Sequence, residues 1–155
     1  MKLNLKYRNS NPIKKTLYLF VFLLFAMILL VPKNSIAQDS KSKEAGTLLI
    51  KIEEGLNTGA VDKFSKYFSA KNYISLAGGT SGYFSANQSY YVLKDFLSVY
   101  QPISFKLTNT VVETSNPFAS GVFKFNNKGI RGTAVAFIAL QFIDNQWRIS
   151  QITIN

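Results

Sequence analysis

The period of the apolar residues changes near the middle of this chain, and the change decides which fold classes are open to it. Before residue 101 most apolar residues recur at the spacing of amphipathic helices, whereas from Ile103 onward they alternate with polar residues, as in half-buried strands. Helices followed by a run of strands with short connections are typical of an α+β domain. We therefore expect a curved antiparallel sheet with about three N-terminal helices packed on one face.

Two helices are predicted to open the domain. The first covers about residues 42–57 and ends at an Asn-Thr-Gly sequence, which is a helix stop signal. Its apolar stripe is formed by Leu48, Leu49, Ile52 and Leu56. A second, short helix is predicted over residues 61–68. Its apolar stripe is formed by Val61, Phe64, Tyr67 and Phe68.

A third helix follows a short strand at residues 73–77 and a glycine-rich turn at residues 78–82. Ser85 and Gln88 have the spacing of a capping box, in which each side chain bonds the backbone amide of the other residue. Pro102 ends this helix. Its apolar stripe is formed by Leu93, Phe96, Leu97 and Tyr100.

The second half of the chain predicts four antiparallel strands. They begin at Ile103, Val122, Thr133 and Trp147. Hairpin turns are predicted at residues 126–129 and at Asp144-Asn145. In the strand at residues 133–143 both alternating sets are apolar, which predicts a central strand with both faces covered.

The last strand contains a change of phase. Trp147 and Ile149 share one face, but Ile152 and Ile154 have the opposite alternation. One extra residue near positions 150–151 would return all four side chains to the same face. The sequence therefore predicts a β-bulge there, which bends the sheet.

The N-terminus has the pattern of a cleavable secretory leader. Residues 1–15 are basic, residues 17–31 form an uninterrupted apolar run, and Ser35-Ile36-Ala37 provides small residues before a cleavage point. The alternative is a membrane anchor, but a spanning helix needs about 20 apolar residues. We expect a signal peptide at 1–37, a flexible segment at 38–44 and a soluble domain at 45–155, located in the periplasm or outside the cell, with no stable membrane span after cleavage.

The positive charge of the chain belongs largely to this leader. The full sequence has 18 basic and 8 acidic residues, a net charge of +10, but six bases and no acids precede residue 38. The remaining bases are scattered, whereas nucleic-acid binding needs a basic patch or stripe. We therefore expect no nucleic-acid partner.

Histidine and cysteine are absent from the sequence, which restricts the available chemistry. The usual general base near neutral pH and the nitrogen and sulfur ligands of zinc sites are thereby excluded. Every acid in the predicted domain falls on a solvated helix face, in a turn or at a strand end, so none is expected to be a buried base. These acids include Glu44, Glu53, Glu54, Asp62, Asp95, Glu113 and Asp144. The sequence predicts no catalytic residue, no metal site and no cofactor.

Four segments carry a resemblance to a known family. They are residues 63–69, 79–88, 91–96 and 146–152. With the order of elements, they resemble a family of exported bacterial proteins classified as a domain of unknown function, over nearly all of residues 45–155. That family is similar to the nuclear transport factor two-like superfamily with its cystatin-like cone, which also contains ketosteroid isomerase and polyketide cyclases. The resemblance implies a cone-shaped fold and no particular activity, because fold alone does not define function.

A pocket between helices and concave sheet is the expected binding site for a small apolar ligand. Its predicted walls are Tyr83, Tyr90, Leu93, Phe105, Phe123, Phe137 and Trp147. The same tyrosines could instead fill the core with their hydroxyls at its edge. The leading hypothesis is an exported noncatalytic domain that binds an apolar ligand or a protein partner. The alternatives are an isomerase, dehydratase or cyclase, and a structural envelope module that forms a homodimer through its sheet.

Overall fold

The helices precede the main strands in the structure, as the hydrophobic period predicts. The structure is a computed structural model that describes residues 20, 21, 23 and 34–155. The elements are α2 (Asn34–Thr58), the 3-10 turns η1 (Val61–Lys63) and η2 (Ser65–Tyr67), β1 (Phe68–Leu76), β2 (Ser81–Phe84), α3 (Ala86–Val99), β3 (Gln101–Val111), β4 (Phe118–Asn127), β5 (Ile130–Ile143) and β6 (Gln146–Ile154).

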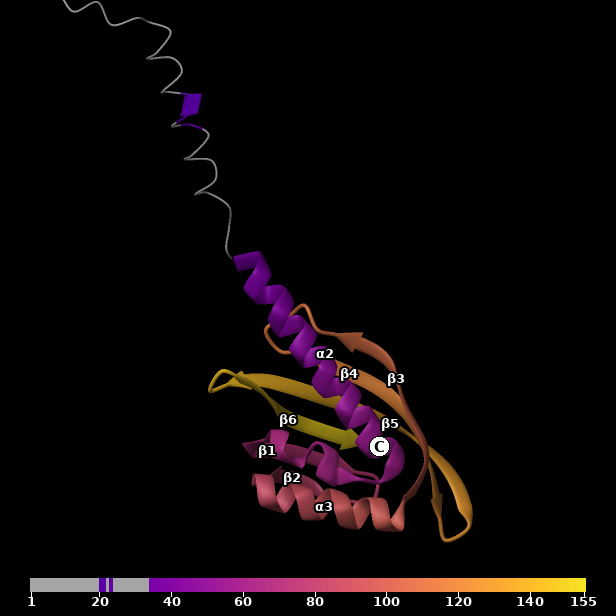
Figure 1. Cartoon of the computed structure of the whole chain (residues 1–155). Helices are drawn as coiled ribbons and strands as arrows, with labels where there is room; N and C mark the ends of the chain where they lie inside the picture. The colour runs from indigo at the N-terminus through magenta and orange to yellow at the C-terminus, as the bar shows by residue number, and fades with distance from the viewer. Residues whose placement is uncertain (1–19, 22, 24–33) are drawn as a thin grey trace, which may run out of the picture. The chain divides into compact units, whose positions relative to one another are not determined.

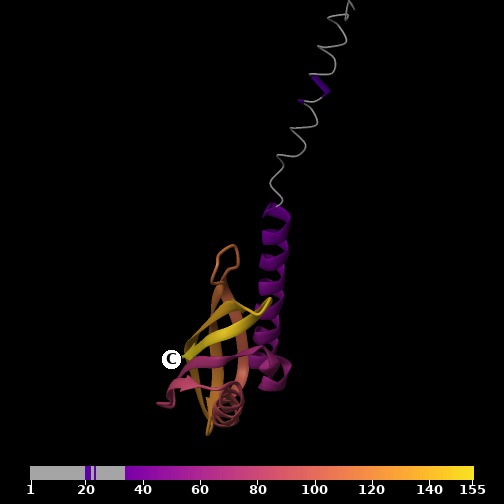
Figure 2. The same ribbon diagram turned by 90° about the vertical axis from the view of Figure 1, so that its left-hand side faces the viewer.

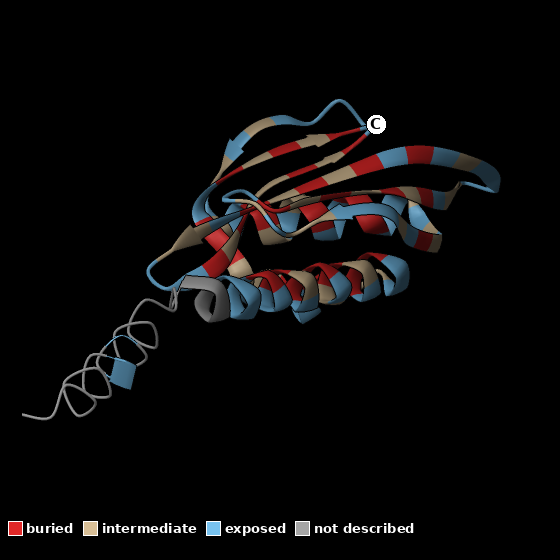
Figure 3. Ribbon diagram, turned by 90° about the horizontal axis from the view of Figure 1, so that it is seen from above, coloured by how far each residue is buried: buried red, intermediate tan, exposed pale blue. Residues whose placement is uncertain are grey.

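The strands form one curved six-stranded sheet in the order β2-β1-β6-β5-β4-β3 (Figure 1). Strands β1 and β6 are parallel, and all other neighbouring strands are antiparallel. Figure 2 shows the curvature of the sheet from the side, with α2 running along it. The buried residues of α2 and α3 face the sheet (Figure 3). The predicted α+β plan with helices on one face is confirmed.

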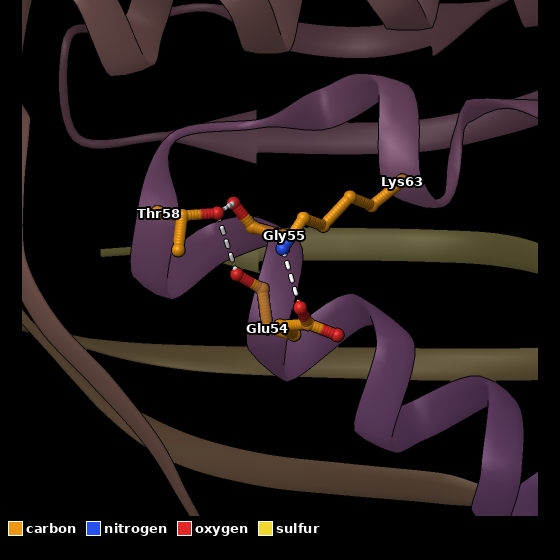
Figure 4. Close-up of polar contacts among 4 residues, drawn as sticks. All are labelled: Glu54, Gly55, Thr58 and Lys63. Carbon is orange, nitrogen blue, oxygen red and sulfur yellow. Dashed lines mark hydrogen bonds and ion pairs between the residues drawn. The ribbon is translucent and has the colours of Figure 1, made fainter.

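Helix α2 is longer than the predicted 42–57. Residues 38–44, for which we expected a flexible segment, continue the helix, and Gly59 ends it with a φ of 70° that favours glycine. In the last turn the Thr58 hydroxyl donates to the carbonyl of Glu54 at 2.8 Å, and Glu54 pairs with Lys63 (Figure 4). The predicted apolar stripe of Leu48, Leu49, Ile52 and Leu56 is buried, and Ala45 is buried one turn before it.

The second predicted helix is wrong in type. Residues 61–63 and 65–67 form two 3-10 turns, and Val61 in the first turn and Phe64 between the two are buried. Phe68 adopts an extended conformation and pairs with Ile149 of β6. Because Phe68 already pairs with β6, the residues of the predicted last helical turn belong to a strand. The segment that remains is too short for a full α-helix.

The predicted capping box and the predicted turn at Asp144-Asn145 are confirmed. The Gln88 amide donates to the Ser85 hydroxyl at 3.3 Å, and the Ser85 amide donates to the Gln88 side chain at 2.9 Å. Asp144 and Asn145 join β5 to β6 with φ values of 50° and 58°, as a two-residue hairpin turn requires.

The predicted bulge lies at Ser150. In the β5–β6 pairing, Ala139 is opposite Gln151 and Leu140 is opposite Ile149, so Ser150 is the extra residue. Its hydroxyl donates to the Ala139 carbonyl at 3.1 Å. The four apolar side chains of β6 consequently share the core face and are buried. They are Trp147, Ile149, Ile152 and Ile154.

Strand β5 is central, but among the described residues only one of its faces is covered. Ala134, Ala136, Ile138 and Leu140 face the core and are buried. On the opposite face, which we call the outer sheet face, the Val135 side chain is 62% exposed. Phe137 on this face is half-buried and stacks on Phe118 at 5.7 Å between ring centroids. The prediction that both faces are covered is therefore wrong for the described part of the chain, since α2 and α3 lie on the same side of the sheet.

A buried polar cluster, which the sequence pattern did not single out, joins β1 to α3. Asn72 is fully buried at a point where the register of β1 against β6 shifts. Its side-chain oxygen accepts from the Ser69 amide at 2.9 Å, and its nitrogen donates to the Ser89 hydroxyl at 3.0 Å. These bonds satisfy the groups that the irregular strand would otherwise leave buried without partners.

The predicted leader falls mostly on residues outside those that the structure describes. Its expected cleavage point, between residues 37 and 38, lies within helix α2. Among the described residues, no helix has both the length and the apolar character needed to cross a bilayer.

Candidate ligand-binding groove

The structure does not gather the seven predicted wall residues around one cavity. Leu93, Phe105 and Phe123 are buried in the core, where the last two rings lie 6.4 Å apart. Phe137 lies on the outer sheet face because the alternation of β5 directs it away from the core. Of the remaining three, Tyr83 is exposed on β2, Tyr90 is half-buried on α3 and Trp147 is buried on β6. Ligand contact by any of the seven stays a prediction.

A groove of about 420 Å³ lies beside residues 40–51 of α2. It is bounded by this helix, by η2 and by the start of β6 with the preceding turn. Its lining residues are Ser40, Lys43, Glu44, Thr47, Leu48, Lys51, Tyr67, Asn145, Gln146 and Trp147. The volume falls within the range of about 300–1,000 Å³ that small-molecule sites occupy. Trp147 is the residue that this groove shares with the predicted wall.

The indole of Trp147 forms a fixed apolar wall of the groove. Its Nε1–H donates to the Lys41 carbonyl at 2.9 Å, so the polar edge of the ring is satisfied by helix α2. The Phe142 ring meets it edge-to-face at 5.0 Å, and the Lys41 ammonium lies 4.2 Å from the centroid of Phe142. Leu48 supplies a second buried apolar side chain. These contacts hold the indole in one orientation.

A lysine and a tyrosine form the polar part of the groove. The Lys51 ammonium donates to the Tyr67 hydroxyl at 3.0 Å, and both side chains are half-buried. The hydrogen bond from Lys51 lowers the pKa of Tyr67, because the donor stabilises the phenolate. The ammonium of Lys66 lies 5.2 Å from the Tyr67 ring and lowers the same pKa to a smaller extent.

The acids of the domain are placed much as expected, with one exception. Asp95 is exposed on α3, and Asp144 is exposed in a turn. Glu53, which we expected on a solvated helix face, is half-buried and accepts a hydrogen bond from the Leu107 amide at 3.1 Å. Glu44 lines the groove but is exposed, with the Ser40 hydroxyl 3.4 Å from its carboxylate. Burial is the usual means of tuning a carboxylate for general-base catalysis, and Glu44 lacks it.

Metal chemistry has no candidate ligand set within the described part of the chain. No group of three or more His, Cys, Asp or Glu residues gathers there around a common point.

The spacing of three polar residues in α2 is a partial signal for this groove. Lys43, Thr47 and Lys51 recur every four residues, so they lie along one face of a helix. Tyr67 could not be assigned to the same site, because the pattern placed it in the apolar stripe of a predicted helix. The Trp147–Lys41 bond joins residues 106 positions apart, a pairing that no local pattern predicts.

The curved sheet with helices on one face defines a nuclear transport factor two-like fold, and solved structures support this assignment. A structure from Bacteroides ovatus, described as a DUF4783 family protein, is 19% identical, with a TM-score of 0.60 over 67% of this chain and 90% of that one. An NTF-2-like protein of unknown function from Shewanella oneidensis is 15% identical, with a TM-score of 0.53 over 72% and 96%. A putative dehydratase from Streptomyces avermitilis is 11% identical, with a TM-score of 0.57 over 75% and 95%. These likenesses concern the fold.

Sequence comparison gives the family. Residues 49–155 match the profile described as "Domain of unknown function (DUF4783)", and the chain belongs to this family. No curated protein matches the sequence.

Proposed function

We propose that this domain is an exported, noncatalytic binding module whose groove beside α2 receives a small molecule with an apolar body. The observation that carries the proposal is the wall formed by Trp147 and Leu48 in a groove of about 420 Å³. An indole whose N–H is already bonded offers an apolar surface with no unsatisfied donor, which suits an apolar ligand.

The packing of the sheet supports a site beside the helix rather than inside the cone. The core face of the central strands is filled by side chains that are fully buried, including Ile138, Ile149 and Ile152. Enzymes of this superfamily typically place an acid, histidine or tyrosine inside the cone. Here the acid of the groove, Glu44, is exposed and lies outside the core. Binding without catalysis agrees best with this arrangement.

A matched pair of substitutions on α2 tests this function. Thr47→Phe fills the groove, whereas Ile50→Phe adds a similar ring at a position that is 63% exposed and does not line it. We expect Thr47→Phe to weaken binding of apolar ligands by about tenfold, or roughly 1.4 kcal/mol, and Ile50→Phe to leave it unchanged.

The emission of Trp147, the single tryptophan of the sequence, reports binding directly. Titration with aromatic, steroid and fatty-acid probes should change this emission saturably, and calorimetry provides a second readout. Flat titrations across the panel by both methods would contradict the proposal.

A dimerising structural module is the second candidate, and the outer sheet face favours it. Val135 is 62% exposed there, beside the stacked pair Phe118 and Phe137. An apolar patch with a polar rim is typical of protein–protein interfaces. Sedimentation of the protein and of a Val135→Lys variant distinguishes the two candidates. A dimer that the variant disrupts would support this second function.

A further inference from the structure

The groove contains more positive than negative charge, which constrains the ligand further. Among its lining residues, Lys43 and Lys51 are basic and Glu44 is acidic. Among the described residues, a salt bridge joins Lys63 to Glu54 near the C-terminal end of α2 (Figure 4). Neither Lys43 nor Lys51 forms a salt bridge with a described residue. The ammonium of Lys66 adds a third positive charge near the Tyr67 ring.

Lys51 and Tyr67 together present hydrogen-bond donors to the groove. An ammonium has three donors, and within the described residues Lys51 uses one of them, toward the Tyr67 oxygen. Because this oxygen accepts from Lys51, the phenolic proton is directed elsewhere and can be donated to a ligand. Two adjacent donors, one of them charged, match the two oxygens of a carboxylate.

We propose that the groove binds a small amphipathic anion, with its carboxylate on Lys51 and Tyr67 and its apolar body against Trp147 and Leu48. This inference rests on the proposed binding function and specifies the chemical class of the ligand. The partial burial of Lys51 strengthens its attraction for an anion, because fewer water molecules screen the charge. Glu44 disfavours a second anionic group on the ligand.

Three probes with the same alkyl chain separate charge from apolar contact. Octanoate, octanol and octylamine are titrated into the protein, with Trp147 emission and calorimetry as readouts. We expect octanoate to bind about tenfold or more tightly than octanol, and octylamine to bind most weakly. Octanol binding in itself tests the proposed function, whereas the ratio of octanoate to octanol tests the present inference.

Substitutions in the groove identify the residues that cause the preference for octanoate. Lys51→Met should reduce the ratio of octanoate to octanol affinity to about one, and Tyr67→Phe should reduce this ratio as well. Lys63→Met is the matched control, since Lys63 pairs with Glu54 and does not line the groove. It should bind octanoate like the unmodified protein.

Each outcome decides between the two proposals. Equal binding of octanoate and octanol, or a preference for octylamine, overturns the anion inference and leaves the binding function in place. No binding of any probe overturns both. Should Lys51→Met fail to fold, the selectivity of the unmodified protein and the Tyr67→Phe variant still give the answer.

Discussion

The Asn57 side chain, at the end of helix α2, accepts a hydrogen bond from the backbone amide of Phe105 on strand β3, at 2.8 Å. One helical turn earlier, Glu53 accepts from the Leu107 amide at 3.1 Å. Strand β3 is an edge of the sheet, where the amides that point away from β4 have no second strand to bond. The helix therefore occupies an edge that would otherwise be open to pairing with another chain.

Removal of the Asn57 acceptor should destabilise the domain. Asn57→Ala leaves the partly buried Phe105 amide without its partner, and we expect a loss of about 1–3 kcal/mol in the free energy of unfolding. Asn57→Asp keeps an acceptor at the same position and should lose less. Urea titration measures both, and equal stability of the alanine variant and the unmodified protein would contradict this role.

Gly55→Ala should destabilise the protein, although alanine is the better helix former. A Cβ at position 55 would lie 2.4 Å from the Phe64 ring, which is fully buried and cannot move freely. Gly46→Ala in the same helix is the control, because its Cβ would meet Val112 at an ordinary 3.9 Å. That variant should gain up to about 1 kcal/mol. Opposite signs in thermal melting are expected, and a gain at position 55 would show that the close contact is relieved without cost.

Tyr67 should ionise at a lower pH than an ordinary tyrosine, and Lys51 should be the main cause. The ammonium of Lys51 stabilises the phenolate, so Lys51→Met should raise the pKa of Tyr67 toward its usual value of 10.0. Lys66→Met should raise this pKa less, because Lys66 contributes less to the shift. The pH dependence of the Tyr67 Cζ resonance measures both. An unchanged midpoint in Lys51→Met would show that the two groups do not interact in solution.

Phe123→Ala should cost more stability than Phe137→Ala. Phe123 is fully buried in the core, so its truncation leaves a cavity and should lower the free energy of unfolding by about 3–5 kcal/mol. Phe137 is half-buried on the outer sheet face, and its loss removes mainly the contact with Phe118. Denaturant titration of the two variants decides. Equal losses would indicate that the outer sheet face is covered in solution.

The secretory leader should be removed after Ala37. Protein recovered from the cell envelope should then have an intact mass that begins at Gln38. This cut would remove the first residues of helix α2 and keep Lys41, whose carbonyl binds Trp147. Full-length protein in the membrane fraction would instead support the anchor alternative.

Local patterns predicted the parts of this fold that local chemistry controls. The capping box at Ser85 and the bulge at Ser150 follow from side-chain types and phase alone. Which faces of β5 are buried could not be predicted. Its alternating residues are apolar on both faces, and this pattern is the same whether a helix or solvent covers a face. The groove was missed for a related reason: the Lys51–Tyr67 contact depends on where η2 places its chain against α2.

Strand β6 lies between β1 and β5, although it follows all the other strands in the sequence. A ribosome therefore finishes β1, β2 and the β3–β5 strands before the segment that joins them exists. A stop codon that removes residues 146–155 would leave two separate sheet fragments rather than a shortened sheet. For an exported protein of the kind proposed above, this order of synthesis would keep the sheet from closing until β6 has been made.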